Sequence, residues 1–309
     1  MRGWVQVFFH CGIGVYDIGF GLILLGLMLM AVLYSSIGHG GASGYLVVLS
    51  LTSFGMMEPV WLKQNVWCLN LVVSSIAFYH YRNSGFHDWG LTIPFVISSV
   101  PMVLIGSYMR VDGALYDVLL SFVLLLAAWR LFSTVDHDGQ GVYEAPGFRR
   151  DVLGIGGGIG FASGVIGLGG GIFLSPLIIL KKWGSPKATA ATASVFVWLN
   201  SATGLIGSSV SEGFGVEFSD LAPFAMAVLI GGFLGSRYGA GFAPENRVRA
   251  FLILVLVIAF TILFLLCIQL VAMSKMLRDP KKLVPWYNGT GVLLYVIGMM
   301  VSATGLGYF

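Results

Sequence analysis

Two glycine-rich clusters, each placed between two apolar runs, are the residues best suited to bind a ligand. The first, residues 36–44, reads SIGHGGASG, and the second, residues 164–171, reads GVIGLGGG. Glycine tolerates positive φ and lets a ligand approach the backbone, so such a cluster can open a helix and turn unpaired N–H groups toward a cavity. These donors and the positive end of the helix dipole suit an anion. Close packing of helices through small residues is the alternative interpretation.

Polar side chains in and near the clusters favour a binding site. Asn70 and Asn200 occupy matching places in apolar segments, where an unpaired amide is costly, so each must bond a neighbouring helix or a ligand. His39 is titratable and either contacts the anion, carries a proton or is a neutral, hydrogen-bonded residue at a helix break. The residues predicted to bind the substrate lie in the clusters and their flanking segments: Gly38, His39, Gly40, Gly41, Ser43, Asn70, Gly167, Gly169, Gly170, Gly171, Asn200 and Thr203.

Charged residues lie mostly at the ends of apolar segments. Lys63 and Arg237 are weaker candidates, as vestibule residues that attract anions, and snorkelling toward water is the alternative. Acidic residues also fall near segment ends, which leaves no mid-membrane carboxylate for a cation and favours an anionic cargo. The spacing of Cys and His matches no metal site, so neither a metal nor a cofactor is expected. Four aromatic residues are typical of belts at the membrane–water interface: Tyr34, Trp61, Trp67 and Trp286.

The two glycine clusters belong to two related halves. A nearly constant offset of 129 or 130 positions relates residues 37–41 to 166–170, Leu69-Asn70 to Leu199-Asn200, and Pro94-Phe95 to Pro223-Phe224. Such a constant offset indicates an internal repeat. Each unit is predicted to hold a glycine-broken helical hairpin followed by three spanning helices, the third at 115–132 or 250–273. Because the number of crossings is odd, the second unit is expected to be inverted.

The apolar segments that follow the clusters are short. A spanning helix needs about 20 residues at a rise of 1.5 Å per residue, and residues 41–54 and 171–180 fall below that length. We therefore predict half-helices or broken helices there. Non-helical backbone at membrane depth is tolerated only where it is buried in protein or lines a wet cavity, so the clusters are expected to point inward.

Composition places both halves in a bilayer. Of the 309 residues, 57% are hydrophobic and only 10% are charged, whereas soluble domains carry about a quarter charged residues. The predicted fold is an all-α polytopic membrane protein with two inverted-topology repeats and one extra C-terminal helix. Its parts are a first repeat (1–134), a connecting loop (135–151) that the Lys and Arg distribution places in the cytoplasm, a second repeat (152–273), and a loop with the extra transmembrane helix (274–309).

The second cluster continues into a longer signature. The run from Gly167 to Gly171, with Pro176 five residues later, resembles the GxGGGxxxxP-like signature of the sulfite exporter TauE/SafE family of membrane permeases. The first cluster departs from it, with Ala42 at the third glycine and Val47 at the proline. The resemblance extends over about residues 20–270. It implies export or uptake of sulfite, a sulfonate such as sulfoacetate, or a related sulfur oxyanion.

These observations predict a secondary transporter, a permease or exporter of a small anion that works by alternating access in the cell (inner) membrane. An anion-selective channel is the first alternative. An intramembrane enzyme is less favoured, since it would need a nucleophile–base pair or a set of metal ligands. The expected partners are the small anion and the lipid bilayer. A homo-oligomer is allowed, and no nucleic acid is expected.

Overall fold

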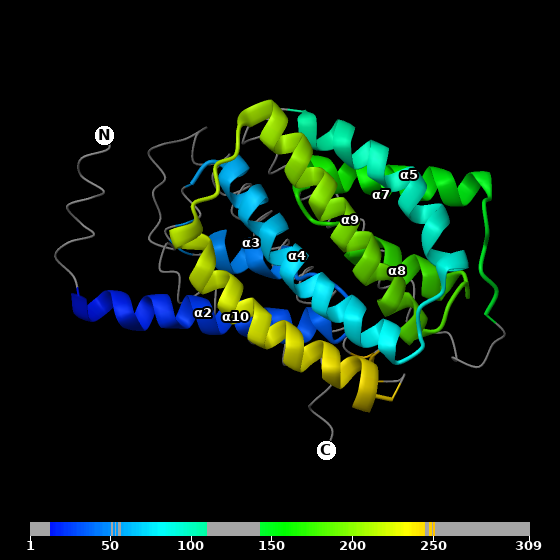
Figure 1. Ribbon diagram of the computed structural model, residues 1–309, viewed down its shortest axis with the longest axis horizontal. Coiled ribbons are helices and arrows are strands. Elements are labelled where there is room, and N and C mark those ends of the chain that lie inside the picture. The colour runs from blue at the N-terminus through cyan, green and yellow to red at the C-terminus, as the bar shows by residue number, and fades with distance from the viewer. Residues whose placement is uncertain are drawn as a thin grey trace, which may run out of the picture. The chain divides into compact units, whose positions relative to one another are not determined.

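The computed structural model describes residues 13–50, 52, 54, 57–109, 143–244, 247, 248 and 250. The chain divides into two compact units, Met1–Ala259 and Phe260–Phe309, and every described residue lies in the first. Regular structure in the described residues is entirely helical, which confirms the predicted all-α class. The helices are α2 (Ile13–Ser35), α3 (Ala42–Ser50), α4 (Pro59–Asn83), α5 (Trp89–Tyr108), α7 (Arg150–Ile166), α8 (Gly171–Leu180), α9 (Pro186–Glu212), α10 (Phe218–Arg237) and the short π-helix η2 (Tyr238–Phe242) (Figure 1).

The same order of helix lengths occurs twice. A long helix, a short helix and two long helices follow one another as α2 to α5 and again as α7 to α10. The short helices α3 and α8 have 9 and 10 residues, about half of what a spanning helix needs. The prediction of short helices after the glycine clusters is thus confirmed. The third predicted spanning helix of each repeat and the extra C-terminal helix lie outside the described residues, apart from position 250.

Three helices in the described part of the chain are long and apolar enough to cross a membrane: α5, α9, and α10 together with η2. Helix α4 has 25 residues, enough to span, but its polar residues lower its hydropathy. Those in its first half, among them Lys63, Gln64, Asn65 and Asn70, are all buried. Because lipid offers polar groups no partners, α4 must meet other helices with this polar side.

Local sequence sets where several helices begin and end. Ser185 caps α9 by accepting a hydrogen bond from the N–H of Ala188 at 3.3 Å, and Asp88 caps α5 by accepting one from Gly90 at 2.8 Å. A proline near the first position opens both α4 and α9, where its fixed φ is favourable and its missing N–H costs nothing. Helix α7 ends at Ile166, and the next residue, Gly167, has a φ of 91°, a left-handed conformation that lets the chain leave the helix.

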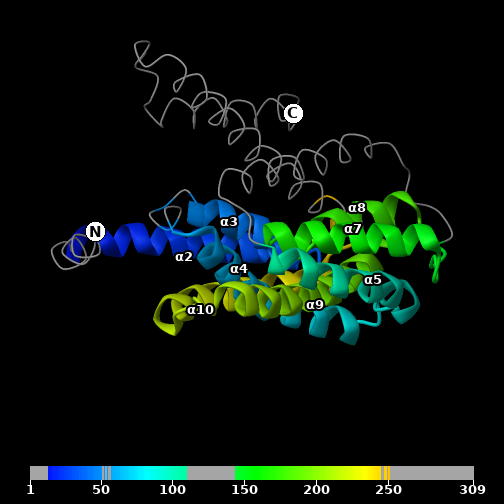
Figure 2. The ribbon, with the colours of Figure 1, turned by 90° about the horizontal axis from the view of Figure 1, so that it is seen from above.

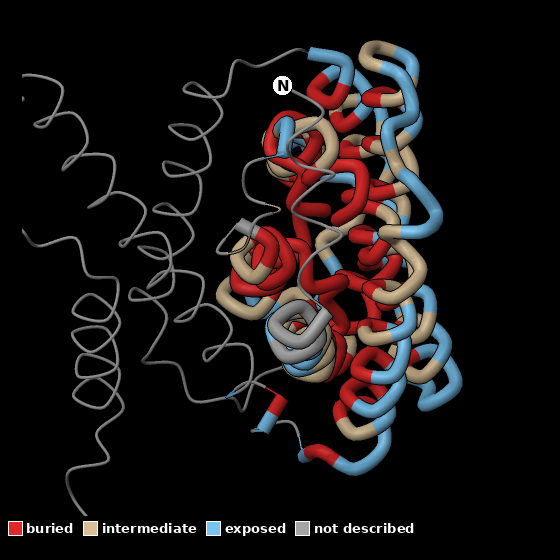
Figure 3. The backbone as a smooth tube through the Cα atoms, turned by 90° about the vertical axis from the view of Figure 1, so that its left-hand side faces the viewer, coloured by how far each residue is buried: buried red, intermediate tan, exposed pale blue. Residues whose placement is uncertain are grey.

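The helices of the two halves are interleaved. Helix α5 packs on α7, α2 on α10, and α4 on α9. Figure 2 shows the hairpins α2–α3 and α7–α8 on one side and α5, α9 and α10 on the other. Buried residues gather where these helices face one another, and exposed residues lie along the outer side (Figure 3).

Glycines spaced by four residues allow two of these contacts. Gly156, Gly160 and Gly164 on α7 lie directly against the backbone of α5, and Gly231, Gly235 and Gly239 on α10 and η2 lie against α2 and the residue that follows it. Small residues at this spacing let two membrane helices approach closely enough for van der Waals packing to hold them. Each half is thereby joined to the other half at two separate places.

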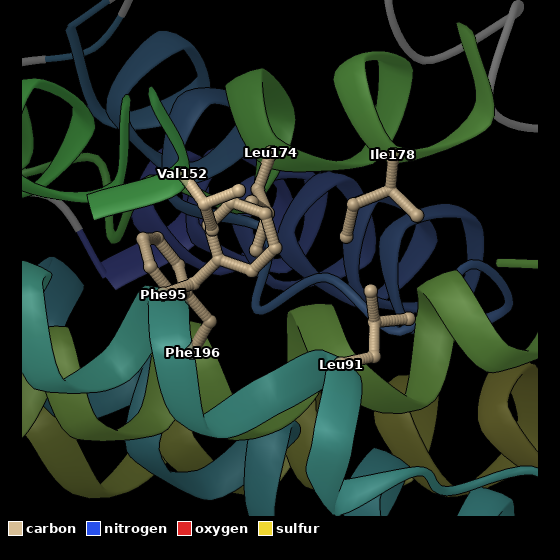
Figure 4. Close-up of a cluster of buried hydrophobic side chains, with 6 residues drawn as sticks. All are labelled: Leu91, Phe95, Val152, Leu174, Ile178 and Phe196. Atoms are coloured by element: carbon tan, nitrogen blue, oxygen red, sulfur yellow. The ribbon is translucent and has the colours of Figure 1, made fainter. Parts of the chain in front are cut away.

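A hydrophobic cluster fixes the second hairpin. It comprises Leu91 and Phe95 of α5, Val152 of α7, Leu174 and Ile178 of α8, and Phe196 of α9 (Figure 4). All six side chains are fully or almost fully buried. Because they come from four helices, the cluster determines where α8 begins, and hence where the second glycine loop lies.

Candidate functional site

The two glycine clusters form the breaks between the helices of each hairpin. Residues 36–41 separate α2 from α3, and residues 167–170 separate α7 from α8. The glycines with positive φ in these breaks are Gly38, Gly41, Gly167, Gly169 and Gly170. A helix therefore starts directly after each break, and its first N–H groups have no carbonyl partner within the helix.

Asn70 of α4 lies between the two breaks. It is fully buried, and a methyl group at Gly40 would lie 2.5 Å from its Oδ1, while one at Gly169 would lie 2.9 Å from its Nδ2. Gly40 and Gly169 are equivalent in the two halves, 129 positions apart. The amide of Asn70 thus contacts the same position of both breaks, and only glycine leaves it room. The structure brings both predicted loops together around one side chain.

The two asparagines differ in their hydrogen bonds. Ser99 Oγ donates to Asn200 Oδ1 at 2.7 Å, and Asn200 Nδ2 donates to the carbonyl of Gly169 at 3.3 Å. Asn70 Nδ2 donates to Ser201 Oγ at 3.2 Å, but its Oδ1 has no hydrogen-bond partner among the described residues. Asn200 is therefore occupied by helix contacts, whereas one atom of the Asn70 amide is available to a ligand.

Either the oxygen or the nitrogen of the Asn70 amide can face a ligand, depending on how the amide is turned. A serine hydroxyl both donates and accepts, so Ser201 can bond the amide oxygen as well as the amide nitrogen. Turning the amide by a half-turn keeps that bond and points the N–H₂ group at Gly40, where it can donate to an anion. The assignment of O and N in such a side chain follows from its hydrogen-bond network. A bound anion would change that network.

His39 joins the first break to α8. Its Nδ1 bonds the carbonyl of Ile37 at 2.9 Å, and its Nε2 lies 3.2 Å from Ser175 Oγ. The ring is buried, and a methyl group at Gly171 would lie 2.9 Å from its Cδ2. With both ring nitrogens engaged, this geometry favours a hydrogen-bonded histidine at a helix break over a direct anion contact.

The hydroxyls of the first hairpin form a second polar group. Tyr34 and Ser43 bond each other through their hydroxyls at 2.6 Å. The hydroxyl of Tyr45 is buried beside Gly41 and has no partner among the residues that the structure describes. Ser43, one of the predicted binding residues, is thus paired with Tyr34 in the hairpin.

The remaining candidates lie further from the breaks. Lys63 is only 3% exposed, and its Nζ donates to the carbonyl of Val165 at the end of α7 at 3.3 Å. The prediction of a vestibule position for Lys63 therefore needs correction, because its ammonium group lies at the negative end of a helix inside the protein. Arg237 is exposed at the end of α10. Thr203 is half-buried on α9, three residues beyond Asn200.

The interfacial-belt interpretation is wrong for two aromatic residues. Trp67 is 0% exposed and Tyr34 is 2% exposed, because both face other helices. Trp61 is half-buried and stacks on Phe54, and Trp286 lies outside the described residues. The sequence could have indicated that Trp67 faces other helices. Trp67 lies four residues after Lys63 and three before Asn70, which puts all three on one face of a helix.

Residues 22–263 match the family described as sulfite exporter TauE/SafE. This chain belongs to the sulfite exporter TauE/SafE family. The match includes both hairpins and every described helix from the middle of α2 onward, and thus all of the geometry given above. The chain is accordingly a transmembrane transporter of the TauE/SafE family.

Similar proteins agree with this assignment. The chain is 30% identical over 252 residues, 77% of its own length, to the probable membrane transporter protein y4hK of Sinorhizobium fredii, of which 95% is covered. A short segment is 53% identical over 51 residues to the bacteriochlorophyll synthase 33 kDa chain of Rhodobacter capsulatus, and one of 39 residues is 67% identical to that of Cereibacter sphaeroides. These segments cover 17% and 13% of those two proteins. No solved structure matches the chain.

The family signature of the second half can now be placed. Gly167 directly follows α7, Gly170 directly precedes α8, and Pro176 lies inside α8. The first two N–H groups of α8 precede its first intrahelical bonds, in which Phe173 and Leu174 donate to the carbonyl of Gly170 at 3.2 and 3.3 Å. In this TauE/SafE chain, the signature therefore builds a helix N-terminus beside Asn70 and His39.

Proposed function

We propose that the chain is a secondary transporter that carries sulfite, an organosulfonate or a related sulfur oxyanion across the cell (inner) membrane by alternating access. The substrate is held between the two glycine breaks. The observation that carries this proposal is the position of Asn70, whose buried amide contacts equivalent glycines of both halves and keeps one atom without a partner in the described part of the chain. A buried polar group without a partner is costly, so a native fold keeps one where a ligand or water satisfies it.

The helix N-termini at the breaks supply the positive potential for an anion. Helix α8 begins beside His39, and α3 begins directly after Gly41. Unpaired N–H groups and the positive end of each helix dipole favour a negative charge there. Together with the Asn70 amide in its N–H₂-facing orientation, these donors suit the several acceptor oxygens of a sulfur oxyanion.

The pairing of the helices supports two inverted repeats. Helix α5 of the first half contacts α7 and α9 of the second, and α10 of the second half contacts α2 and α4 of the first. If each helix of one half is replaced by its equivalent in the other half, the α5–α7 contact becomes α10–α2 and the α5–α9 contact becomes α10–α4. The α4–α9 contact maps onto itself. That exchange is expected of a two-fold axis, and an odd number of crossings per repeat places the axis in the membrane plane. The substrate would then lie near the axis, where α4 meets α9.

Flux measurements test the function. Purified protein in liposomes is expected to carry sulfite with a rate that saturates and that rises when sulfite is present on the opposite side. A current that follows voltage without saturating would indicate an anion channel instead. Binding measured against sulfite, sulfoacetate, thiosulfate, sulfate and simple carboxylates would identify the preferred anion, and absence of any anion binding or flux would contradict the proposal.

The Asn70→Ala variant tests the site. A hydrogen bond to a charged group contributes about 1.5–3 kcal/mol, so sulfite affinity is expected to fall by about tenfold or more. The matched control is Asn65→Ala, because Asn65 is equally buried on the same helix and its Oδ1 also has no partner among the described residues, but Asn65 is not among the nearest neighbours of any glycine in the two breaks. That control should change sulfite affinity less than twofold. Equal losses in both variants, or none in Asn70→Ala, would place the site elsewhere.

A further inference from the structure

One face of α4 carries a row of buried polar groups toward Asn70. Lys63, Trp67, Asn70 and Ser74 recur at spacings of four, three and four residues, and all are buried. Such spacing aligns side chains on one face of a helix. At a rise of 1.5 Å per residue, Trp67 lies about 4.5 Å along the axis from Asn70 and about 6 Å from Lys63.

Trp67 presents a buried donor in this row. Its side chain is 0% exposed, and Nε1 has no hydrogen-bond partner among the described residues. The ring packs against Gly204 of α9, where a methyl group would lie 2.7 Å from Cε2 and Cζ2 and 3.2 Å from Nε1. A buried indole N–H usually finds a partner. Because no described residue pairs with this N–H, it is placed to donate to a ligand that enters the α4–α9 interface.

The chemistry of the row determines the kind of ligand. An indole N–H and a lysine ammonium group only donate hydrogen bonds, so neither can coordinate a cation. The Lys63 ammonium group begins the row, bonded to the carbonyl of Val165 and near enough to Glu212 to interact electrostatically with it. A ligand beside Trp67 must accept a hydrogen bond, as an oxyanion does.

We propose that Trp67 Nε1–H is a second contact for the transported oxyanion, on an approach along the α4–α9 interface to Asn70. This proposal rests on the proposed transport of a sulfur oxyanion. The anion bonds the indole N–H one helical turn before it reaches the glycine breaks. Trp67 thus acts on the rate of entry and on selection for acceptor-rich anions, whereas Asn70 holds the anion between the two halves.

The test replaces the indole N–H while keeping an aromatic ring. In liposomes, Trp67→Phe should carry sulfite about tenfold more slowly than wild type at concentrations below saturation, which is the loss expected for one bond to a charged ligand. The matched control is Trp198→Phe on α9, because Trp198 is 40% exposed on the side away from the core. That variant should transport within twofold of wild type.

A second substitution separates the N–H from the packing of the ring. Benzothienylalanine at position 67 keeps the shape of the indole and replaces N–H by sulfur, so it should transport as slowly as Trp67→Phe. Wild-type rates with benzothienylalanine, or with Trp67→Phe, would overturn the second contact. If Asn70→Ala still weakens sulfite binding in that case, the proposed function stands without it. If wild-type protein neither binds nor carries sulfite, the proposed function itself fails.

Discussion

Asn70 and Asn200 occupy equivalent positions on α4 and α9, and both are fully buried beside a glycine break. Both amide atoms of Asn200 are bonded, to Ser99 and to the carbonyl of Gly169, whereas the one side-chain partner of Asn70 among the described residues is Ser201. Two halves with related sequences therefore use the same residue in different ways. One asparagine bonds the backbone of a helix break, and the other, in the proposed site, keeps an amide atom for the ligand.

The difference comes from the helix that faces each asparagine. Ser99 of α5 bonds Asn200, and the residue equivalent to Ser99 in the second half, 129 positions later, is Val228 of α10. Val228 is buried but has no hydroxyl to offer. A single residue can thus make the two repeats differ. With valine in place of serine at position 228, no hydroxyl from α10 bonds the Asn70 amide.

The largest expected effect belongs to Asn200. Asn200→Ala leaves the Ser99 hydroxyl and the Gly169 carbonyl without their partner, which should lower the free energy of unfolding by about 2–4 kcal/mol. For a chain of this size, the unfolding temperature would fall by roughly 5–10 °C. Thermal unfolding in detergent measures this, and Ser99→Ala, which removes one of the two bonds, should give about half the change.

One result for Asn200→Ala would contradict the roles given to the two asparagines. If Asn200→Ala unfolds at the wild-type temperature but loses sulfite binding, Asn200 is the ligand contact. The assignment of structural and binding roles to the two asparagines would then have to be exchanged.

Val228→Thr should give the next largest effect, because it restores the missing hydroxyl. Gly232 packs on Val73 and Gly239 on Tyr81, so α10 and α4 run in the same direction and Val228, one turn before Gly232, lies at the level of Asn70. A threonine hydroxyl can donate to Asn70 Oδ1, which holds the amide in its present orientation and keeps its N–H₂ group from turning toward the anion. Sulfite affinity should fall about tenfold while the free energy of unfolding stays equal or rises.

Val228→Ala is the control for this experiment. It removes side-chain volume and adds no hydroxyl, so it should lower the free energy of unfolding by about 1–2 kcal/mol and change sulfite affinity little. Equal affinities in Val228→Thr and wild type would show that Asn70 and the residue opposite it are not coupled.

The sequence predicted the parts of this comparison that depend on local pattern. The constant offset indicated two related halves and paired Asn70 with Asn200, and the lengths of the apolar runs indicated the short helices after the breaks. The sequence could not predict which asparagine has both amide atoms bonded, because Ser99 reaches Asn200, and Ser201 reaches Asn70, from another helix. It also misplaced Trp67 and Lys63, since a polar or aromatic residue near a segment end looks the same in sequence whether it faces lipid headgroups or another helix.

The smallest expected effect concerns Tyr45, whose equivalent in the second half is Leu174. Both side chains are fully buried, but the Tyr45 hydroxyl has no partner in the described part of the chain. Removing a buried hydroxyl that bonds nothing costs no interaction and ends its desolvation penalty, so Tyr45→Phe should raise the free energy of unfolding by up to about 1 kcal/mol. Tyr34→Phe, which breaks the bond to Ser43, should lower the free energy of unfolding by about the same amount.

Sulfite affinity of Tyr45→Phe should stay within twofold of wild type. A tenfold loss would mean that the hydroxyl contacts the anion, and the site would then extend from Asn70 past Gly41 into the first hairpin, on the side where the second half has only leucine.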